Sequence, residues 1–229
     1  MSCKPYSYPT KGFFMSISSP MTIKSLLTEM PLIAILRGVK PAEAPQVAKV
    51  LIDAGFRIIE VPLNSPNPIE SIRRMVHELG DQALFGAGTV TDPLSIAEIK
   101  AAGGRVIISP HLNVDIVNLT KKNELFSIPG VATPSEAFTA LAAGADALKL
   151  FPGEACPPKV LKAIKVVLPP QTLLLPVGGI NQGNMADYWQ AGAAGFGIGS
   201  NLYAPGRNVE EIALRANELV VAMNSIRGG

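Results

Sequence analysis

Two charged residues stand inside apolar runs, where they could carry out chemistry. Glu60 interrupts the run Ile58 to Leu63, and Lys149 interrupts the run Ala145 to Phe151. An ionised side chain buried without a partner is strongly destabilising, so each group must be paired, hydrated in a cavity or neutral. A structural ion pair is one explanation. Because buried pairs add little net stability, the pattern favours a functional site.

A buried lysine is suited to imine formation, because burial disfavours the ammonium and the neutral amine is the nucleophile. At its ordinary pKa of about 10.4, a lysine is neutral for only about one part in several thousand at pH 7, and a pKa near 7 recovers about a thousandfold. A carboxyl group nearby can move protons to and from the carbinolamine, the substrate hydroxyl and the enamine carbon. We therefore predict that Lys149 is a Schiff-base nucleophile and Glu60 its general acid and base.

Polar and glycine residues follow several of the other apolar runs. Arg37 follows the first run, where its planar guanidinium can hold a carboxylate, although a surface arginine that caps a strand is the alternative. Thr89 ends Gly86-Ala87-Gly88-Thr89 and offers a hydroxyl beside backbone that a ligand can approach, with a simple turn as the alternative. Glycines after the last two runs allow backbone N–H groups to converge on a phosphate. The predicted phosphate-binding residues are Gly178, Gly179, Gly199 and Ser200.

Neither the histidines nor the cysteines predict a metal site. His77 falls in a segment that is expected to be a solvent-facing helix, and His111 follows Ser109-Pro110, where it could line the rim of a pocket. One imidazole does not make a metal site. Cys3 and Cys156 are too few for a disulfide framework and lack metal-ligand spacing. We expect no metal, no cofactor and a cytoplasmic location.

Eight short apolar runs must position these residues, and they alternate with longer segments of helical period. This alternation is typical of a parallel sheet covered by helices. The runs are Leu32 to Leu36, Ile58 to Leu63, Ala83 to Phe85, Val106 to Ile108, Leu125 to Ile128, Ala145 to Phe151, Leu173 to Val177 and Phe196 to Ile198. The expected helices are Thr22 to Met30, Ala42 to Ala54, Pro68 to Leu79, a helix after Asp92-Pro93, Val114 to Lys122, a helix after Thr133, Pro157 to Leu168, Met185 to Ala191 and Val209 to Ser225. Asp92-Pro93 resembles an N-cap with proline behind it, and Thr133-Pro134-Ser135-Glu136 resembles a capping box.

The fold class predicted from this order is α/β, as a single (β/α)8 barrel with an extra N-terminal helix. An open doubly wound sheet is the alternative, and it would place a glycine-rich phosphate loop after its first strand. Here that loop reads Arg37-Gly38-Val39-Lys40-Pro41. The glycine pairs follow the seventh and eighth runs instead, where barrels commonly bind phosphate.

Length and composition indicate one compact domain over residues 22–229, since the chain has 229 residues, 48% of them hydrophobic and 17% charged. Residues 1–21 lack the continuous apolar run of a signal peptide or membrane anchor and are expected to form a disordered N-terminal extension. The net charge is +2 and no stretch clusters Lys and Arg, which argues against a nucleic-acid or membrane partner. Any anionic partner should therefore be a small molecule.

Taken together, these residues resemble the 2-keto-3-deoxy-6-phosphogluconate and 2-keto-3-deoxy-6-phosphogalactonate aldolase family from Pro31 to about Val221. The resemblance is carried by Pro31 to Gly38, Glu60 to Pro66, Gly86 to Val90, Lys149 to Pro152, Val177 to Ile180 and Gly199-Ser200. It implies that Arg37, Thr89 and Phe151 border the pyruvate portion of a phosphorylated keto-deoxy sugar acid. It also implies cleavage of the C3–C4 bond to pyruvate and glyceraldehyde 3-phosphate, without metal or organic cofactor, in a homotrimer.

Two substrate-binding positions resemble the galactonate branch of the family. Gluconate enzymes typically carry arginine where this chain has Asn64 and threonine where it has Val177. We therefore predict a 2-dehydro-3-deoxy-6-phosphogalactonate aldolase, with a 2-dehydro-3-deoxy-6-phosphogluconate aldolase that also acts on 4-hydroxy-2-oxoglutarate as the alternative. A sugar-phosphate isomerase or epimerase barrel would not explain a buried Lys149. A non-catalytic sugar-phosphate sensor would require Lys149 and Glu60 only to pair with each other.

Overall fold

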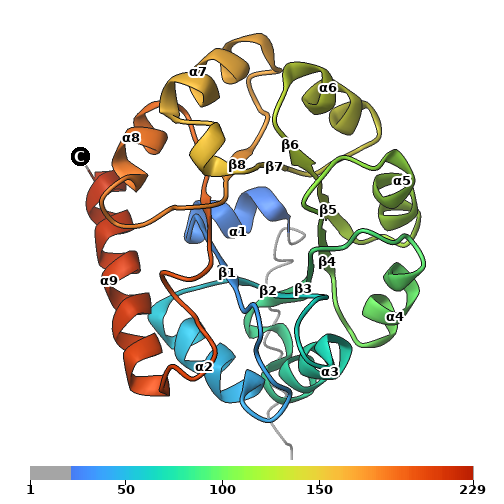
Figure 1. Cartoon of the computed structure of the whole chain (residues 1–229), viewed down its shortest axis with the longest axis vertical. Helices are drawn as coiled ribbons and strands as arrows, with labels where there is room; N and C mark the ends of the chain where they lie inside the picture. Colours follow the sequence, from blue (N-terminus) through green and yellow to red (C-terminus); the bar gives the residue numbers. More distant parts are fainter. Residues whose placement is uncertain (1–21, 229) are drawn as a thin grey trace, which may run out of the picture.

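The protein has an α/β fold in which helices form a ring around a curled parallel sheet (Figure 1). The computed structural model describes residues 22–228, and the predicted extension over residues 1–21 lies outside them. The strands are β1 (Leu32–Ile35), β2 (Ile58–Pro62), β3 (Leu84–Gly88), β4 (Val106–Ile108), β5 (Phe126–Ile128), β6 (Gly130–Val131), β7 (Leu148–Leu150), β8 (Leu174–Pro176) and β9 (Phe196–Ile198). The α-helices are α1 (Ile23–Glu29), α2 (Ala44–Ala54), α3 (Pro68–Leu79), α4 (Ser95–Ala101), α5 (Val114–Lys122), α6 (Pro134–Ala142), α7 (Pro158–Val167), α8 (Met185–Gln190) and α9 (Val209–Gly228).

All of the strand pairs are parallel and fall into two ladders. Six strands pair in the order β5-β4-β3-β2-β1-β9, and three pair in the order β6-β7-β8. Val177 and Gly197 form one further parallel bridge just beyond β8 and within β9. Only Pro129 separates β5 from β6, and a proline has no N–H to donate to a ladder. Its carbonyl still accepts from the Lys149 N–H at 2.9 Å.

Every apolar run predicted to be a strand overlaps one, but two details differ. The third strand was expected to end at Phe85, whereas β3 continues to Gly88, because Gly86 and Gly88 pair with Glu60 and Pro62 of β2. The short β6 was not expected, since two residues after a proline carry no periodic signal. The Gly86-Ala87-Gly88 segment is therefore strand and not a turn.

Of the two helix N-caps predicted from the sequence, the structure confirms one and contradicts the other. Thr133 and Glu136 form the predicted capping box of α6. The expected N-cap at Asp92 is wrong, because α4 begins only at Ser95 and its N-cap residue has no side-chain hydrogen bond. The Asp92 carboxylate instead accepts from the Leu94 N–H at 2.9 Å, which closes a local turn before the helix.

Side chains of alternate strand residues face opposite sides of the sheet. In β2, Ile58 belongs to the cluster enclosed by the curled sheet, and Ile59 belongs to the larger cluster beneath the outer helices. The enclosed cluster also contains Ile23, Leu26 and Leu27 of α1. Because its strand members include residues near the starts of β1 to β4, α1 covers the amino ends of the strands and leaves the carboxyl ends available for a pocket.

None of the helices in residues 22–228 is both long enough and apolar enough to cross a bilayer.

Candidate active site

Lys149 and Glu60 lie inside the curled sheet, on strands from its two ladders. Alternation places both side chains on the enclosed side, because Ala147 and Ile58, two residues earlier on each chain segment, belong to the enclosed cluster. Lys149 is 4% exposed and Glu60 is 1% exposed. Both border a cavity of about 10 Å³ among Ile33, Ile108 and other aliphatic side chains. The sequence prediction that each charge points into the core is therefore confirmed.

The two groups do not form the structural ion pair that was the alternative explanation. Within residues 22–228, no salt bridge or hydrogen bond joins Lys149 to Glu60, and Glu60 Oε2 has no hydrogen-bond partner. The Nζ atom of Lys149 lies 4.8 Å from the centroid of the Phe151 ring, within the range of a cation–π contact. The two charges attract each other, but without a direct contact between them, and with Glu60 Oε2 unpartnered, they do not make the hydrogen-bonded pair that a structural role would require.

Burial moves both groups toward their neutral forms. Desolvation raises the pKa of Glu60 from 4.5 to about 7, and the charges of Lys149 and Arg37 and the Gly88 backbone prevent a larger rise. Desolvation also lowers the pKa of Lys149, with the Glu60 charge opposing this change and the Arg37 charge adding to it. A nucleophilic amine and a carboxyl group that titrates near neutrality therefore share one site.

A glycine creates the space that the Glu60 carboxylate occupies. Gly88 lies on the neighbouring strand β3, two residues beyond the register partner of Glu60, and a Cβ atom added to it would overlap both carboxylate oxygens of Glu60. The absence of a side chain at Gly88 therefore makes room for the Glu60 carboxyl group.

Arg37, Asn64 and Thr89 are brought together at the ends of β1, β2 and β3. An Nη atom of Arg37 donates to Asn64 Oδ1 at 2.6 Å, and the other donates to Thr89 Oγ1 at 3.4 Å. Thr89 adopts φ 54°, which is uncommon for a residue with a Cβ and is often found at functional sites. Arg37 lines the large pocket, but Asn64 and Thr89 do not. Their contacts therefore position the guanidinium.

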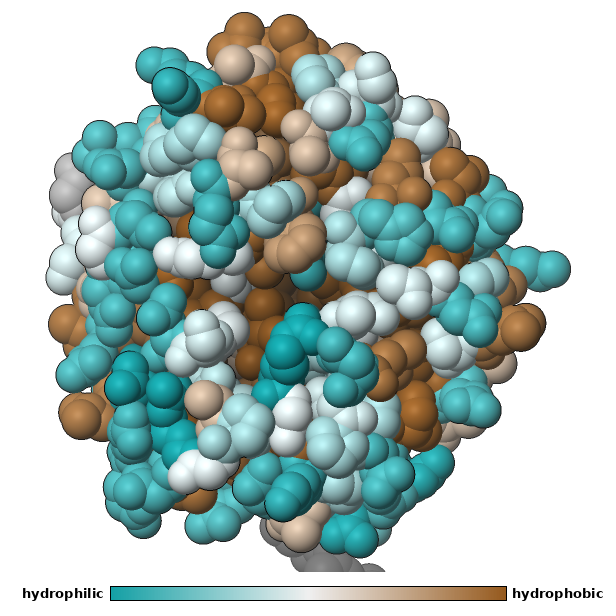
Figure 2. Space-filling view, viewed as in Figure 1, coloured by the Kyte–Doolittle hydropathy of each residue, from teal (hydrophilic) through white to brown (hydrophobic). Residues whose placement is uncertain are grey.

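A pocket of about 420 Å³ opens beyond Lys149 at the carboxyl ends of the strands. The predicted residues that line it are Arg37, Lys149, Phe151, Val177, Gly178, Gly179, Gly199 and Ser200. Figure 2 shows a hollow near the middle of the face, with hydrophobic surface below a rim of more hydrophilic side chains. The structure thus places the buried lysine and both glycine loops around one space.

The two glycine loops expose backbone N–H groups and fix backbone carbonyls. Among residues 22–228, no hydrogen bond occupies the N–H groups of five loop residues, which are Gly178, Gly179, Ile180, Ser200 and Asn201. Gly178 and Gly179 have φ values of 110° and 66°, which favour glycine. A Cβ added to Gly199 would have no neighbour within 4 Å. Backbone amides without a partner, beside the free space at Gly199, are suited to an anion such as phosphate.

Sequence reasoning missed several residues of the pocket. Glu154 lines it, and a Cβ added to Gly178 would lie 2.5 Å from Glu154 Oε2, so the glycine leaves room for this side chain. Tyr203 also lines the pocket and donates to Glu43 Oε1 at 2.8 Å. Glu154 lies just beyond Lys149 to Pro152, so a charged residue after a strand end was the available signal.

The part of the chain that the structure describes contains no group of three or more His, Cys, Asp or Glu side chains that could hold a metal ion. His77 and His111 are both exposed, and His111 does not line the pocket.

Known proteins share this arrangement over most of the chain. Residues 23–216 match the aldolase family described as KDPG and KHG aldolase. The 2-dehydro-3-deoxy-6-phosphogalactonate aldolase of Escherichia coli K12 is 44% identical over 195 residues, which cover 85% of this chain and 95% of the relative. A structure described as native KDPGal has a TM-score of 0.86 and 42% identity, and the match covers 88% of this chain and 98% of the other. KDPG aldolase from Legionella pneumophila, with pyruvate captured as a covalent carbinolamine, has a TM-score of 0.77 and 30% identity, and the match covers 86% and 97% of the two chains. The chain belongs to the KDPG and KHG aldolase family of class I, Schiff-base aldolases.

Proposed function

We propose that this protein cleaves 2-dehydro-3-deoxy-6-phosphogalactonate to pyruvate and D-glyceraldehyde 3-phosphate through a Schiff base on Lys149. The observation that carries the proposal is a desolvated lysine near a buried carboxyl group that has one unpartnered oxygen, at the base of a pocket lined by two glycine loops. The substrate named for the Escherichia coli relative has the keto group and the phosphate that these two parts would bind.

The reaction begins when neutral Lys149 attacks the C2 carbonyl of the substrate to give a carbinolamine. Loss of water, with protons supplied and removed by Glu60, gives the imine. Glu60 then accepts the proton of the C4 hydroxyl, the C3–C4 bond breaks, and its electron pair moves into the protonated imine to form an enamine. Glyceraldehyde 3-phosphate leaves, Glu60 returns a proton to C3, and water releases pyruvate from Lys149.

The remaining pocket residues orient the substrate in this proposal. Arg37 binds the carboxylate in a two-pronged grip, held in place by Asn64 and Thr89. Phe151 packs against the pyruvate portion beside the Lys149 amine. The phosphate binds the open amides of the two glycine loops, with Gly178, Gly179, Gly199 and the Ser200 hydroxyl around it.

Trapping with pyruvate and borohydride tests the Schiff base, because reduction converts the imine into a stable amine. We expect a three-carbon adduct on Lys149 and none on Lys165, which serves as a control. Burial lowers the pKa of Lys165 as well, but its Nζ atom donates to the carbonyls of Pro170 and Thr172 on another part of the surface. A Lys149→Met variant should acquire no adduct. An unlabelled wild-type Lys149, or equal labelling of Lys165, would exclude the mechanism and favour an isomerase or epimerase.

In this proposal, Val177 determines the preference between the two C4 epimers of the substrate. It lines the pocket and also borders the small cavity beside Glu60, close to the reacting atoms. Valine cannot form a hydrogen bond with a C4 hydroxyl that a threonine would contact. One hydrogen bond is worth about 0.5 to 1.5 kcal/mol, which corresponds to a change of about threefold to tenfold in kcat/KM. We expect Val177→Thr to raise kcat/KM for the gluconate epimer relative to the galactonate epimer by that factor. A wild-type preference for gluconate would reverse the assignment.

We also propose that β5 and β6 count as one bent strand, so that the two ladders close into an eight-stranded barrel preceded by α1 in one domain over residues 22–229. The Val177–Gly197 bridge and the contact from Lys149 to Pro129 support closure at the two junctions. A homotrimer is proposed as the assembly. Val166 and Val167 of α7 are 77% and 53% exposed, and Figure 2 shows hydrophobic surface at the edge over α7, as expected for a contact between copies.

A further inference from the structure

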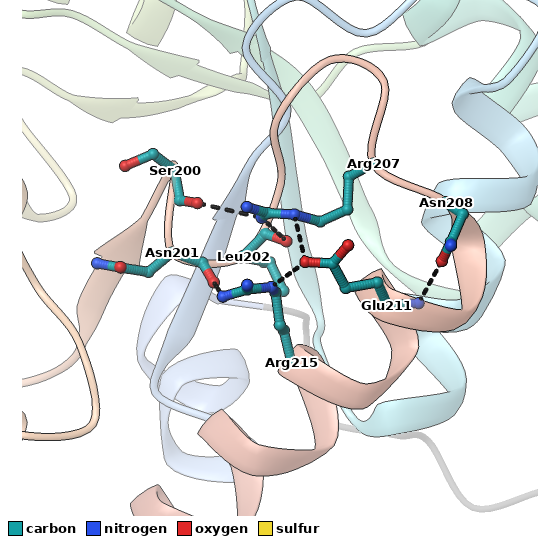
Figure 3. A network of polar contacts seen from close by, with 7 residues as sticks. All are labelled: Ser200, Asn201, Leu202, Arg207, Asn208, Glu211 and Arg215. Carbon is teal, nitrogen blue, oxygen red and sulfur yellow. Dashed lines mark hydrogen bonds and ion pairs between the residues drawn. The ribbon is translucent and has the colours of Figure 1, made fainter.

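Behind the second glycine loop, two arginines bind the backbone carbonyls of successive residues (Figure 3). Arg207 donates to the carbonyls of Ser200 and Leu202 at 3.1 and 2.9 Å, and Arg215 donates to the carbonyl of Asn201 at 3.4 Å. The loop after β9 is therefore fixed on one side over three consecutive peptide groups.

Glu211 joins the two arginines from the first turns of α9. Its Oε1 atom lies 3.2 Å from Arg207 Nε and 2.9 Å from Arg215 Nε. The Glu211 N–H is in turn bound by Asn208 Oδ1 at 2.8 Å. The carboxylate thus aligns both guanidinium groups on the loop, and the side chain of Arg207 is only 15% exposed.

The same loop holds the first glycine loop through a side chain. Asn201 Nδ2 donates to the carbonyl of Ile180 at 2.7 Å. The neighbouring carbonyl of Gly179 accepts from Asn184 at 2.9 Å and from Asn181 at 3.2 Å. Side-chain donors therefore hold the carbonyls of both loops, and the two loops are tied to each other.

The carbonyl contacts determine where the amides point. In a planar trans peptide the C=O and the following N–H point in opposite directions. Because Arg207 binds the Ser200 carbonyl, the Asn201 N–H is directed away from Arg207. The Gly199 carbonyl is likewise held by the N–H groups of Leu202 and Tyr203, which directs the Ser200 N–H outward. These are two of the amides that no hydrogen bond occupies within residues 22–228.

We propose that Arg207, aligned by Glu211 and supported by Arg215, is a positioning residue for the phosphate end of the substrate. Arg207 does not line the pocket, so it acts through the loop and not by contact with the ligand. The inference rests on the proposed function and extends it to residues that no motif had indicated. It also explains how a pocket without a lysine or arginine at its glycine loops can be preorganised for a phosphate.

The test compares two substrates that differ only in the phosphate, the 6-phosphorylated keto-deoxy acid and its unphosphorylated form. We expect Arg207→Gln to raise KM for the phosphorylated substrate about tenfold, with kcat little changed, because charge-assisted hydrogen bonds to the loop are lost. Its kcat/KM for the unphosphorylated form should stay within about twofold of wild type. Arg207→Lys should recover part of the KM, and inorganic phosphate should inhibit Arg207→Gln less than wild type.

Arg227, in the last turn of α9, provides a control. It also donates to two carbonyls, those of Glu29 and Thr28 at 2.9 and 2.6 Å, but at the other end of α9. Arg227→Gln should leave both KM values unchanged. An equal loss for both substrates in Arg207→Gln would show a general structural role and overturn the proposal, as would no loss for either.

A second variant keeps the proposal testable, and a separate result distinguishes its failure from failure of the proposed function. If Arg207→Gln does not fold, Arg215→Gln removes the neighbouring carbonyl contact and should show the same phosphate-specific rise in KM, in smaller size. An Arg215→Gln variant with no phosphate-specific rise in KM would overturn the proposal. Failure of the proposed function itself would appear differently, as a wild-type protein that traps no pyruvate on Lys149 and cleaves neither substrate.

Discussion

Replacing Glu60 with Gln should make the protein more stable at alkaline pH, although it removes the proposed catalytic base. Gln keeps the shape of the side chain but cannot ionise. Burial raises the pKa of Glu60 from 4.5 to about 7 in the folded protein, and unfolding restores the ordinary value. Between these two pH values the folded protein holds a proton that the unfolded chain releases, so the Glu60 contribution to stability is complete below pH 4.5 and is lost as the pH rises through 7.

The size of the effect follows from the two pKa values. A pKa change from 4.5 to about 7 corresponds to about 3 kcal/mol, since each tenfold change in proton affinity is worth about 1.4 kcal/mol. The attraction to Lys149 is already part of the value near 7. The free energy of unfolding of Glu60→Gln should therefore exceed that of wild type by only about 1 kcal/mol at pH 5 and by about 3 kcal/mol at pH 8.

Urea unfolding at pH 5 and pH 8, at one fixed protein concentration, measures both differences. Glu98→Gln is the matched control, because it removes the same charge from an exposed position on α4. A stability difference between Glu60→Gln and wild type that is equal at the two pH values would refute the reasoning, and so would a less stable variant at pH 8.

Three other changes test separate parts of the site. Gly88→Ala should lower kcat at least a hundredfold and lower the free energy of unfolding by about 1 to 3 kcal/mol, because the new methyl group overlaps the Glu60 carboxylate. A variant with activity and a Tm close to those of wild type would contradict this expectation. Gly199→Ala should leave the Tm unchanged, since its Cβ meets nothing within 4 Å, but should raise KM for the phosphorylated substrate, and an unchanged KM would place the phosphate elsewhere. Activity should survive exhaustive EDTA treatment, and a loss that zinc restores would overturn the cofactor-free mechanism.

The burial of Glu60 and Lys149 in one site could be predicted from the sequence, because each charge violates a strong local rule. Strands buried on both faces are almost purely aliphatic, so Glu60 and Lys149 stand out within short runs. Period-two alternation then assigns both side chains to one side of the sheet, where the structure places them. The sequence also indicated that both glycine loops would lie at one pocket, since they follow the last two strands, and the structure places both loops in its lining.

The contacts that support these residues could not be predicted, because they join distant parts of the chain without a periodic signal. Asn64 and Thr89 were predicted to bind substrate, and the structure adds that both accept hydrogen bonds from Arg37. Nothing in the sequence distinguishes Arg207 and Arg215 from ordinary surface charges, and only the fold places them against the carbonyls of the loop after β9. The prediction that Asp92 caps a helix was wrong for the opposite reason. The local sequence signal was clear, but the Asp92 carboxylate accepts a hydrogen bond within a turn and does not cap α4.

Arg37 has an electrostatic effect on the catalytic pair beyond its proposed grip on the carboxylate. Its charge lowers the pKa of Lys149 and also lowers the pKa of Glu60. Both effects favour the deprotonated forms, which are the nucleophilic amine and the basic carboxylate that the first steps require. In the proposed mechanism the substrate carboxylate binds Arg37 and offsets this charge, so both groups should regain proton affinity, which suits the later steps in which Glu60 would donate. Arg37→Gln should therefore move the acidic limb of the pH profile of kcat/KM to higher pH, in addition to weakening substrate binding. A variant that binds substrate poorly but keeps the wild-type pH profile would show that Arg37 acts only by contact.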